Sequence, residues 1–175
     1  MHIRKATIED TESIRNVYRQ AFNSSETRWV SDLAISLLNE NTPVKTISLV
    51  AIENNEIVGH TAFSPVFLKS TNEHFAYILA PLAVSPEFQK NGVGTSLVKY
   101  GLDILSSMGS FIVFVYGDPQ YYARFGFKTD LAQNFTPPYT LQFPEGWHTL
   151  KLNSAVFPGG GKITCVDSLN KPELW

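Results

Sequence analysis

Cysteine is scarce in this sequence, and Cys165 is the only one among 175 residues. A single cysteine excludes an internal disulfide framework, and this usage is typical of proteins in a reducing compartment. We interpret Cys165 as a small buried hydrophobic residue. The first residues, Met1–Lys5, lead directly into amphipathic sequence without an apolar leader. We therefore expect a cytoplasmic protein.

Long hydrophobic runs and an excess of one charge are also missing. The longest apolar stretches lie near Ala76–Val84 and Phe111–Tyr116, and both are too short to span a bilayer. The chain has 14 Lys and Arg against 16 Asp and Glu, for a formal net charge of −2. This balance gives no general attraction for nucleic acid or for an anionic membrane surface, so we expect neither as a partner.

One stretch of the chain combines a strand, a turn and a helix. Residues Phe75–Val84 are apolar, as in a strand, and Pro86 ends that pattern because it has no N–H for a ladder. Gly92 and Gly94 follow, and apolar residues return at helical spacing from Val93 onward. The first N–H groups of a helix lack intrahelical partners and carry the positive end of its dipole, so this place suits a phosphate.

A strand-to-helix turn without any ligand is the alternative, because short glycine motifs are common. Two nucleotide-binding motifs do not fit. A Walker A loop would need a lysine between Gly94 and Thr95, and a dinucleotide fingerprint would need a third glycine where Leu97 stands.

The rest of the chain predicts a single domain, residues 1–175, built from alternating strands and helices. Thr7–Asp10 resembles a capping box. Glu53–Glu56 is a predicted turn that joins its two flanking strands in a hairpin. Asp118 and Pro119 are interpreted as the N-cap and first residue of a short helix. Pro81 lies inside a predicted strand and cannot donate to a neighbour, which indicates a broken or bulged ladder, with an edge strand as the alternative. Gly159–Gly161 is interpreted as a turn or flexible loop, and a hairpin connection is favoured over a phosphate-binding loop because no helical pattern follows. The predicted strands are His2–Ala6, Thr46–Ile52, Ile57–Leu68, Phe75–Val84, Phe111–Tyr116, Trp147–Leu152 and Lys162–Val166.

Two motifs occur in a set order along the chain. The first, Gln89–Gly94, has the form Gln/Arg-x-x-Gly-x-Gly/Ala and follows Leu82–Val84. The second, Tyr121–Phe127, has an aromatic residue, then Tyr-x-x-x-Gly-Phe. Together they resemble the GNAT superfamily of acyl-CoA-dependent N-acyltransferases. Gly59–Pro65 and Gly117–Phe127 are similar to the corresponding stretches of a bacterial subgroup of that superfamily. The resemblance covers residues 1–127, and residues 128–175 are read as further strands and loops of the same domain.

The resemblance implies an α/β (α+β) fold with one mixed, splayed central sheet of about six to seven strands flanked by helices. It implies acetyl-CoA as co-substrate, no metal, and a small-molecule or peptide amine as acceptor, and it also allows a homodimer. The pantetheine arm of acetyl-CoA would lie along the splayed strand and its pyrophosphate at the helix start. The implied cofactor-binding residues are Leu82, Ala83, Val84, Gln89, Lys90, Asn91, Gly92, Val93, Gly94 and Thr95.

Transfer of an acetyl group to an amine needs an acid for the departing thiolate and a base for the amine. The second motif implies Tyr122 as the acid, because a phenol is protonated at neutral pH and can donate to a thiolate. The alternative for Tyr122 is a half-buried aromatic residue of a helix. Glu26 matches a glutamate of the subgroup and is the first candidate for the base, with His60, Glu73 and His74 as alternatives.

We therefore predict an N-acetyltransferase that moves an acetyl group from acetyl-CoA to a primary amine by direct attack. A CoA-binding sensor or regulatory module without turnover is the competing hypothesis. Release of a thiol from acetyl-CoA in the presence of amines separates the two.

Overall fold

The computed structural model describes residues 1–22, 24–154 and 159–175, and the side chains of residues 24–26 lie outside this description. The helices are α1 (Thr11–Ala21), α2 (Ser24–Asn39), α3 (Val93–Ser107) and α4 (Pro119–Ala123). The strands are β1 (His2–Lys5), β2 (Ile47–Glu53), β3 (Glu56–Leu68), β4 (Glu73–Val84), β5 (Ile112–Tyr116), β6 (Phe135–Thr136), β7 (Trp147–Lys151) and β8 (Gly161–Cys165). Short 3-10 turns occupy Ile8–Asp10, Pro86–Phe88, Ala132–Asn134, Pro144–Gly146, Asp167–Leu169 and Pro172–Leu174.

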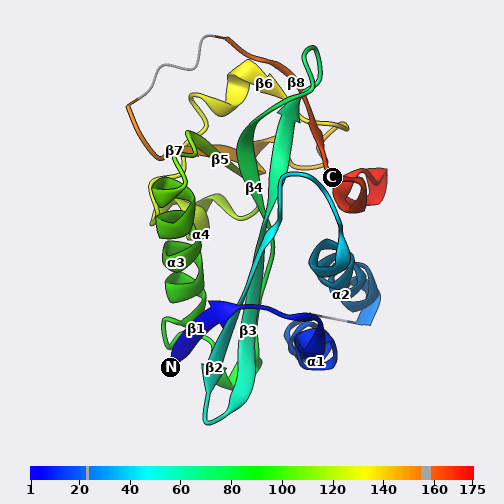
Figure 1. The fold of residues 1–175 in the computed structure, drawn as a ribbon, viewed down its shortest axis with the longest axis vertical. Helices are drawn as coiled ribbons and strands as arrows, with labels where there is room; N and C mark the ends of the chain where they lie inside the picture. Colours follow the sequence, from blue (N-terminus) through cyan, green and yellow to red (C-terminus); the bar gives the residue numbers. More distant parts are fainter. Residues whose placement is uncertain (23, 155–158) are drawn as a thin grey trace. The chain divides into compact units, whose positions relative to one another are not determined.

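Within the described residues, eight strands form a mixed sheet with the main order β1-β2-β3-β4-β5-β7 (Figure 1). Strand β8 pairs with β3 and with the short β6. The predicted mixed sheet flanked by helices is confirmed. The strand number exceeds the expected six to seven because β6 is only two residues long and directly precedes Pro137–Pro138, in a stretch that the sequence predicts as extended chain or loop.

The described chain divides into two compact units. The first unit comprises Met1–Phe63 and Ala80–Leu102, and the second comprises Ser64–Leu79 and Asp103–Trp175. Strands β3 and β4 and helix α3 run from one unit into the other. The single-domain organisation stays a prediction.

Strands β2 and β3 of the first unit form the predicted hairpin. Glu53 pairs with Glu56, which leaves Asn54 and Asn55 as a two-residue loop. Both asparagines have positive φ, 49° and 63°, as a type I′ turn requires. The register shifts at a bulge after this turn, because Ile52 pairs with Ile57 and Ala51 with Gly59. The turn and the bulge together therefore decide which side chains of β3 face each layer of helices.

Helices cover both faces of the sheet in the first unit (Figure 1). Helices α1 and α2 bury Tyr18 and Ala34 in one core cluster with Val50 of β2. On the other face, α3 approaches β3 so closely that a Cβ at Gly59 would lie 3.0 Å from Leu97 Cδ1. The two layers follow from the alternation of side chains along β3.

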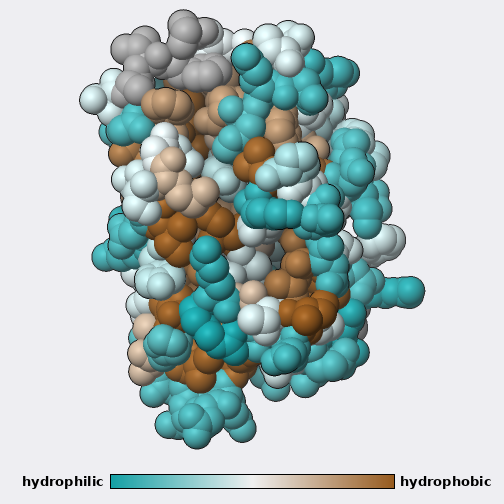
Figure 2. All heavy atoms as spheres, viewed as in Figure 1, coloured by the Kyte–Doolittle hydropathy of each residue, from teal (hydrophilic) through white to brown (hydrophobic). Residues whose placement is uncertain are grey.

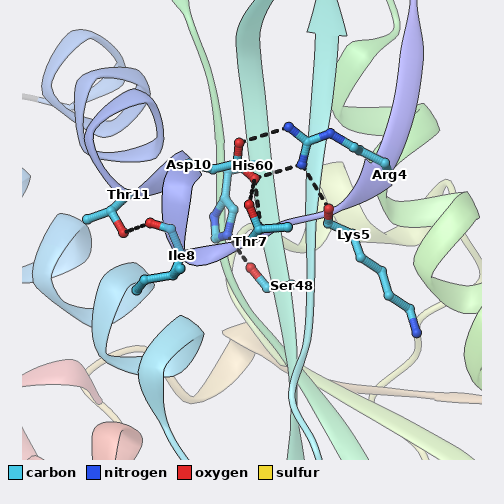
Figure 3. Close-up of polar contacts among 8 residues, drawn as sticks. All are labelled: Arg4, Lys5, Thr7, Ile8, Asp10, Thr11, Ser48 and His60. Carbon is cyan, nitrogen blue, oxygen red and sulfur yellow. Dashed lines mark hydrogen bonds and ion pairs between the residues drawn. The ribbon is translucent and has the colours of Figure 1, made fainter.

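A polar network joins β1 to the start of α1 (Figure 3). Arg4 donates two hydrogen bonds to the Asp10 carboxylate, at 2.7 and 2.8 Å. The backbone N–H of Thr7 donates to Asp10 Oδ2 at 2.7 Å, which confirms the predicted capping box. The hydrogen bonds from Arg4 and Thr7 outweigh burial and lower the pKa of Asp10 to about 2.

The second unit is built on an aromatic core. The Phe114 ring of β5 packs edge-on against Phe75 and Phe135 and stacks on Trp147, with a centroid distance of 5.0 Å in the last pair. Trp147 Nε1 donates to the carbonyls of Ala132 and Phe135 at 3.2 Å. These contacts explain why the segment before β7 folds against the sheet despite its many prolines.

The predicted hairpin between the last two strands is wrong. Strand β7 pairs antiparallel with β5, from Tyr116↔Trp147 to Ile112↔Lys151. Strand β8 pairs instead with the end of β3, from Val66↔Cys165 to Leu68↔Ile163. Each of the two strands therefore pairs with an earlier strand of the chain, and they do not pair with each other. Part of their connection, residues 155–158, lies outside the described residues.

The surface carries separate apolar patches among hydrophilic side chains on the face shown in Figure 2. Large exposed hydrophobic residues of the chain include Trp29, Met108, Phe111 and Phe143. Among the helices described, none is both long enough and apolar enough to cross a membrane.

Candidate functional site

Strand β4 leaves its parallel partner before it ends. Its ladder with β5 runs from Ala76↔Ile112 to Leu79↔Val115, and Pro81 follows two residues later. Because proline has no N–H, it cannot continue such a ladder. The pairing of β4 with β5 thus ends next to Pro81, where the sequence predicted a broken ladder.

The last peptide groups of β4 have a defined orientation. The Ser85 N–H donates to the Val58 carbonyl of β3 at 2.8 Å. In an antiparallel pair, successive residues direct their backbone groups to opposite sides, so the N–H and carbonyl of Val84 point away from β3. The Val84 carbonyl accepts a hydrogen bond from Gln89 Nε2 at 2.9 Å. The glutamine of the first motif therefore ties the loop back to the end of the strand.

The loop from Pro86 to Gly92 leads into α3 with two residues in the left-handed region. Lys90 has φ 63° and Gly92 has φ 81°. A Cβ at Gly92 would meet no atom within 4 Å, so the space beside it is open. The side chains from Gln89 to Asn91 are exposed. Neither Gly92 nor Gly94 is buried against protein, so the helix start is accessible.

The first backbone N–H groups of helix α3 have no hydrogen-bond partner within the helix. Its first intrahelical bond runs from the Ser96 N–H to the Gly92 carbonyl at 2.9 Å, which makes Gly92 the N-cap. The N–H groups of Val93, Gly94 and Thr95 precede that bond. No acidic side chain stands in this first turn, all of which the structure describes. A helix start with these features is favourable for an anion.

The second motif lies in the second unit, on α4 and the turn after it. Asp118 Oδ1 accepts from the Gln120 N–H at 2.9 Å, so Asp118 is the predicted N-cap and Pro119 follows it. The Tyr122 ring contacts Phe127 edge-on at 5.8 Å and packs directly on Gly117, where a Cβ would lie 2.7 Å from Tyr122 Cε2.

Tyr122 is half-buried, and its hydroxyl makes no hydrogen bond to any residue that the structure describes. Desolvation, with smaller contributions from Tyr121 and Asp118, raises the pKa of Tyr122 well above its ordinary value. The phenol is therefore fully protonated at neutral pH and retains a free O–H donor.

Comparison with known proteins decides the family. Residues 2–129 match the model of the acetyltransferase (GNAT) domain. The chain belongs to the GNAT family. This confirms the resemblance drawn from the two motifs.

Individual GNAT relatives are similar over most of their length. The uncharacterized N-acetyltransferase YjhQ of Escherichia coli (strain K12) is 35% identical over 162 residues, which cover 90% of this chain and 88% of YjhQ. The crystal structure of the GNAT family N-acetyltransferase YhbS from Escherichia coli, in complex with CoA, has a TM-score of 0.79 at 27% identity. That alignment covers 97% of this chain and 92% of YhbS. A GNAT family acetyltransferase from Brucella melitensis, in complex with acetyl-CoA, has a TM-score of 0.73 at 26% identity, covering 96% and 97% of the two chains.

The residues implied by the GNAT motifs fall into two groups in the structure. The implied cofactor-binding residues all lie in the first unit, at the end of β4, in the loop and in the first turn of α3, and are Leu82, Ala83, Val84, Gln89, Lys90, Asn91, Gly92, Val93, Gly94 and Thr95. The implied acid, Tyr122, lies in the second unit. The side chain of Glu26, the first candidate for the base, lies outside the described residues.

His60, an alternative for the base, is a core residue of this GNAT chain. It is fully buried, and its ring nitrogens are hydrogen-bonded to the Tyr18 hydroxyl and to Ser48 Oγ, each at 2.8 Å (Figure 3 shows the Ser48 contact). Burial lowers the pKa of His60 to about 3. A histidine with both nitrogens satisfied inside the core does not reach a substrate amine.

The two remaining alternatives stand at the start of β4. Glu73 is exposed there. The His74 ring packs edge-on between Phe67 and Tyr77, at 5.7 and 5.0 Å, and burial lowers its pKa. Nε2 of His74 is buried without a hydrogen-bond partner among the described residues. His74 therefore belongs to an aromatic cluster within the second unit.

The sequence interpretation missed a pocket in the second unit of this GNAT protein. It has a volume of about 430 Å³ and lies between the end of β5, the start of α4 and the last turn of the chain. The residues that line it are Tyr116, Gly117, Asp118, Pro119, Gln142, Phe143, Glu145, Gly146, Glu173, Leu174 and Trp175. The only sequence signal was the density of aromatic residues, which does not reveal which of them meet. No group of three His, Cys, Asp or Glu side chains within the described ranges is arranged to hold a metal ion.

Proposed function

We propose that this GNAT acetyltransferase moves an acetyl group from acetyl-CoA to a primary amine by direct attack. The observation that carries the proposal is the accessible start of α3, where the Gly92 N-cap has open space beside it and three N–H groups precede the first helical bond. The YhbS and Brucella structures, described as complexes with CoA and acetyl-CoA, support the same donor for this chain.

The pyrophosphate of acetyl-CoA is proposed to bind the N–H groups of Val93, Gly94 and Thr95. A helix N-terminus holds an anion through both its free donors and its dipole. Lys90 is exposed in the preceding turn and supplies a positive charge for the phosphates. Gln89 acts indirectly, because its side-chain amide is bound to the Val84 carbonyl and so fixes the loop against β4.

The pantetheine arm is proposed to lie along Leu82–Val84, as a strand would. The Val84 N–H points away from β3, the direction that a ligand beside the edge of β4 requires. That N–H is proposed to stabilise the oxyanion formed when the amine attacks the thioester carbonyl. Donors fixed in place for developing charge are typically among the largest contributions to catalysis.

Tyr122 is proposed as the general acid that protonates the departing thiolate. Its O–H bond breaks, the proton passes to the sulfur, and the phenolate regains a proton from solvent. The raised pKa of Tyr122 keeps the phenol in the acid form throughout the neutral range. Glu26 is proposed as the base that takes a proton from the substrate ammonium, because only the neutral amine has the electron pair that attacks the thioester carbonyl.

Direct attack is favoured over a covalent enzyme intermediate by the state of Cys165. It is the single cysteine of the chain, it is buried, and burial raises its pKa to about 12. The thiolate, which is the nucleophilic form, is thus not populated at neutral pH. The acetyl group is then proposed to pass from sulfur to the amine nitrogen without becoming attached to the protein.

A screen of primary amines with acetyl-CoA tests the proposal against the silent CoA-binding alternative. The proposal predicts thiol release that depends on both acetyl-CoA and an amine, together with an acetylated product. Calorimetric binding of acetyl-CoA without thiol release for any amine class would favour the sensor. Binding of ATP without binding of CoA would contradict both.

A further inference from the structure

We infer that the pocket of the second unit binds the acceptor, and that the acceptor is a small cationic amine with an apolar or aromatic body. This inference rests on the proposed function, because the structure itself shows only the pocket. A volume of about 430 Å³ is within the range of small-molecule sites.

The aromatic wall of the pocket is held in place by its own contacts. The Tyr116 ring stacks on Trp175, with interplanar angle 11° and centroids 6.2 Å apart. Trp175 Nε1 donates to the Leu169 carbonyl at 3.0 Å, which fixes the indole. The Tyr116 hydroxyl accepts from the Phe143 N–H at 2.9 Å, which fixes the opposite segment. The apolar surface is therefore formed before any ligand arrives, which lowers the entropic cost of binding.

Glycines allow two segments of the pocket wall to approach each other closely. A Cβ at Gly146 would lie 3.0 Å from the Gly117 carbonyl oxygen and 3.1 Å from Tyr116 Cε2. The Gly117 N–H donates to the Gly146 carbonyl at 3.0 Å. The peptide of Gly117 is also the surface on which the Tyr122 ring packs. Gly117 thus both lines the pocket and contacts the ring of the proposed acid, inside the same unit.

The charged side chains that line the pocket favour a positively charged ligand. Asp118, Glu145 and Glu173 line it, and its lining includes no Lys, Arg or His. Within the described part of the chain, none of these three carboxylates takes part in an ion pair. An ammonium group would be attracted here, and an anionic group beside the same apolar wall would be repelled.

Binding of a matched pair of probes tests the pocket without any need for turnover. N,N-dimethylphenethylamine is a tertiary amine that cannot be acetylated, and N,N-dimethylphenylalanine adds a carboxylate to the same body. We expect the first probe to bind at least about 10-fold more tightly, because the carboxylate faces three like charges. In NMR titration the indole N–H of Trp175 should shift, and that of the exposed Trp29 on α2 should not.

Variants that remove single carboxylates test whether these charges are responsible for binding of the cationic probe. Glu145→Gln and Glu173→Gln should each weaken binding of N,N-dimethylphenethylamine about 3- to 5-fold, as expected for exposed charges, and more salt should reduce the difference. Glu56→Gln, an exposed glutamate of the β2–β3 turn, is the control and should leave binding unchanged. In the transfer assay, phenethylamine should be acetylated with a higher kcat/KM than phenylalanine, and the ratio should fall in the Gln variants.

The outcomes separate this inference from the proposed function. Transfer to amines with no Trp175 shift and no effect of the Gln variants would overturn the pocket and leave the transferase standing. Probe binding that depends on Glu145 and Glu173, without transfer to any amine, would support the pocket as a cation site and contradict the transferase. Equal binding of both probes would overturn the inference.

Discussion

At the residue scale, the structure separates groups that can react from groups that hold the core. His60 and Tyr122 are both titratable residues near motif positions, yet their surroundings differ. His60 is fully buried with both ring nitrogens bonded, whereas Tyr122 is half-buried with no bond to its hydroxyl from the described residues. A proton donor in catalysis needs a donor group that the fold leaves unpaired, so of these two residues only Tyr122 suits the proposed role of acid.

The depressed pKa of His60 predicts a pH-dependent stability. The folded pKa is about 3, and an unfolded histidine has a pKa of about 6.5. Below pH 6.5 the unfolded state therefore binds a proton that the folded state does not, so the free energy of unfolding should fall by about 1.4 kcal/mol per pH unit toward pH 3. Urea unfolding of the wild type and His60→Gln between pH 7 and pH 4.5 measures this.

The wild type should lose more stability than His60→Gln over that range. The Asp10–Arg4 pair does not interfere, because the pKa of Asp10 is lowered to about 2 and its stabilisation is lost only below about pH 4. Parallel loss of stability in the two proteins would show that His60 does not govern the acid side of the curve.

The role of Tyr122 predicts a selective loss of turnover. Tyr122→Phe removes only the hydroxyl, so kcat should fall by about 100-fold or more while the Kd of acetyl-CoA stays near the wild-type value. Tyr121→Phe is the matched control, since Tyr121 lies on the same helix and packs under the Arg124 guanidinium. Steady-state kinetics and calorimetry on both variants give the answer, and equal kcat in wild type and Tyr122→Phe would remove the role.

At the element scale, helix α3 carries the central feature. It begins after Gly92 and ends before Gly109, and both glycines have positive φ, 81° and 78°. A Cβ at either glycine would meet nothing within 4 Å. The two ends are thus equivalent in backbone strain, but only the first exposes free N–H groups.

This equivalence provides a controlled test of the helix start. Gly92→Ala and Gly109→Ala should each lower the free energy of unfolding by about 1 kcal/mol, because alanine is strained at positive φ. Only Gly92→Ala should weaken binding of CoA, by about 10-fold, since its methyl group stands beside the proposed pyrophosphate site. The measurements are thermal unfolding and calorimetric titration. A similar loss of CoA affinity in both variants would point to general destabilisation instead.

Most elements could be predicted from the sequence because their signals are local. The asparagine turn between β2 and β3, the proline in β4 and the glycines around α3 each constrain the backbone at their own positions. The partners of β7 and β8 could not be predicted, because strand pairing depends on contacts between distant residues such as Val66 and Cys165. The pocket was missed for the same reason, since Tyr116 and Trp175 meet only in the folded chain.

At the scale of the whole molecule, binding of the donor should stabilise the fold. A ligand that binds only the folded protein adds about 2.7 kcal/mol at 100 times its Kd. Acetyl-CoA should therefore raise the thermal unfolding midpoint in proportion to the logarithm of its concentration. Pantetheine, which lacks the pyrophosphate, should raise it far less, because the helix start would have no anion to hold. Equal shifts with both ligands, measured by calorimetry, would place the binding energy elsewhere.

The most direct test follows the acetyl group itself. Acetyl-CoA with an isotopic label in the acetyl group is mixed with the protein and an accepted amine, and the reaction is stopped within one turnover. We predict that the label moves from CoA to the amine nitrogen, with one thiol released per acetylated amine and no label on the protein. Label found first on the protein, or label that never leaves CoA, would contradict direct transfer.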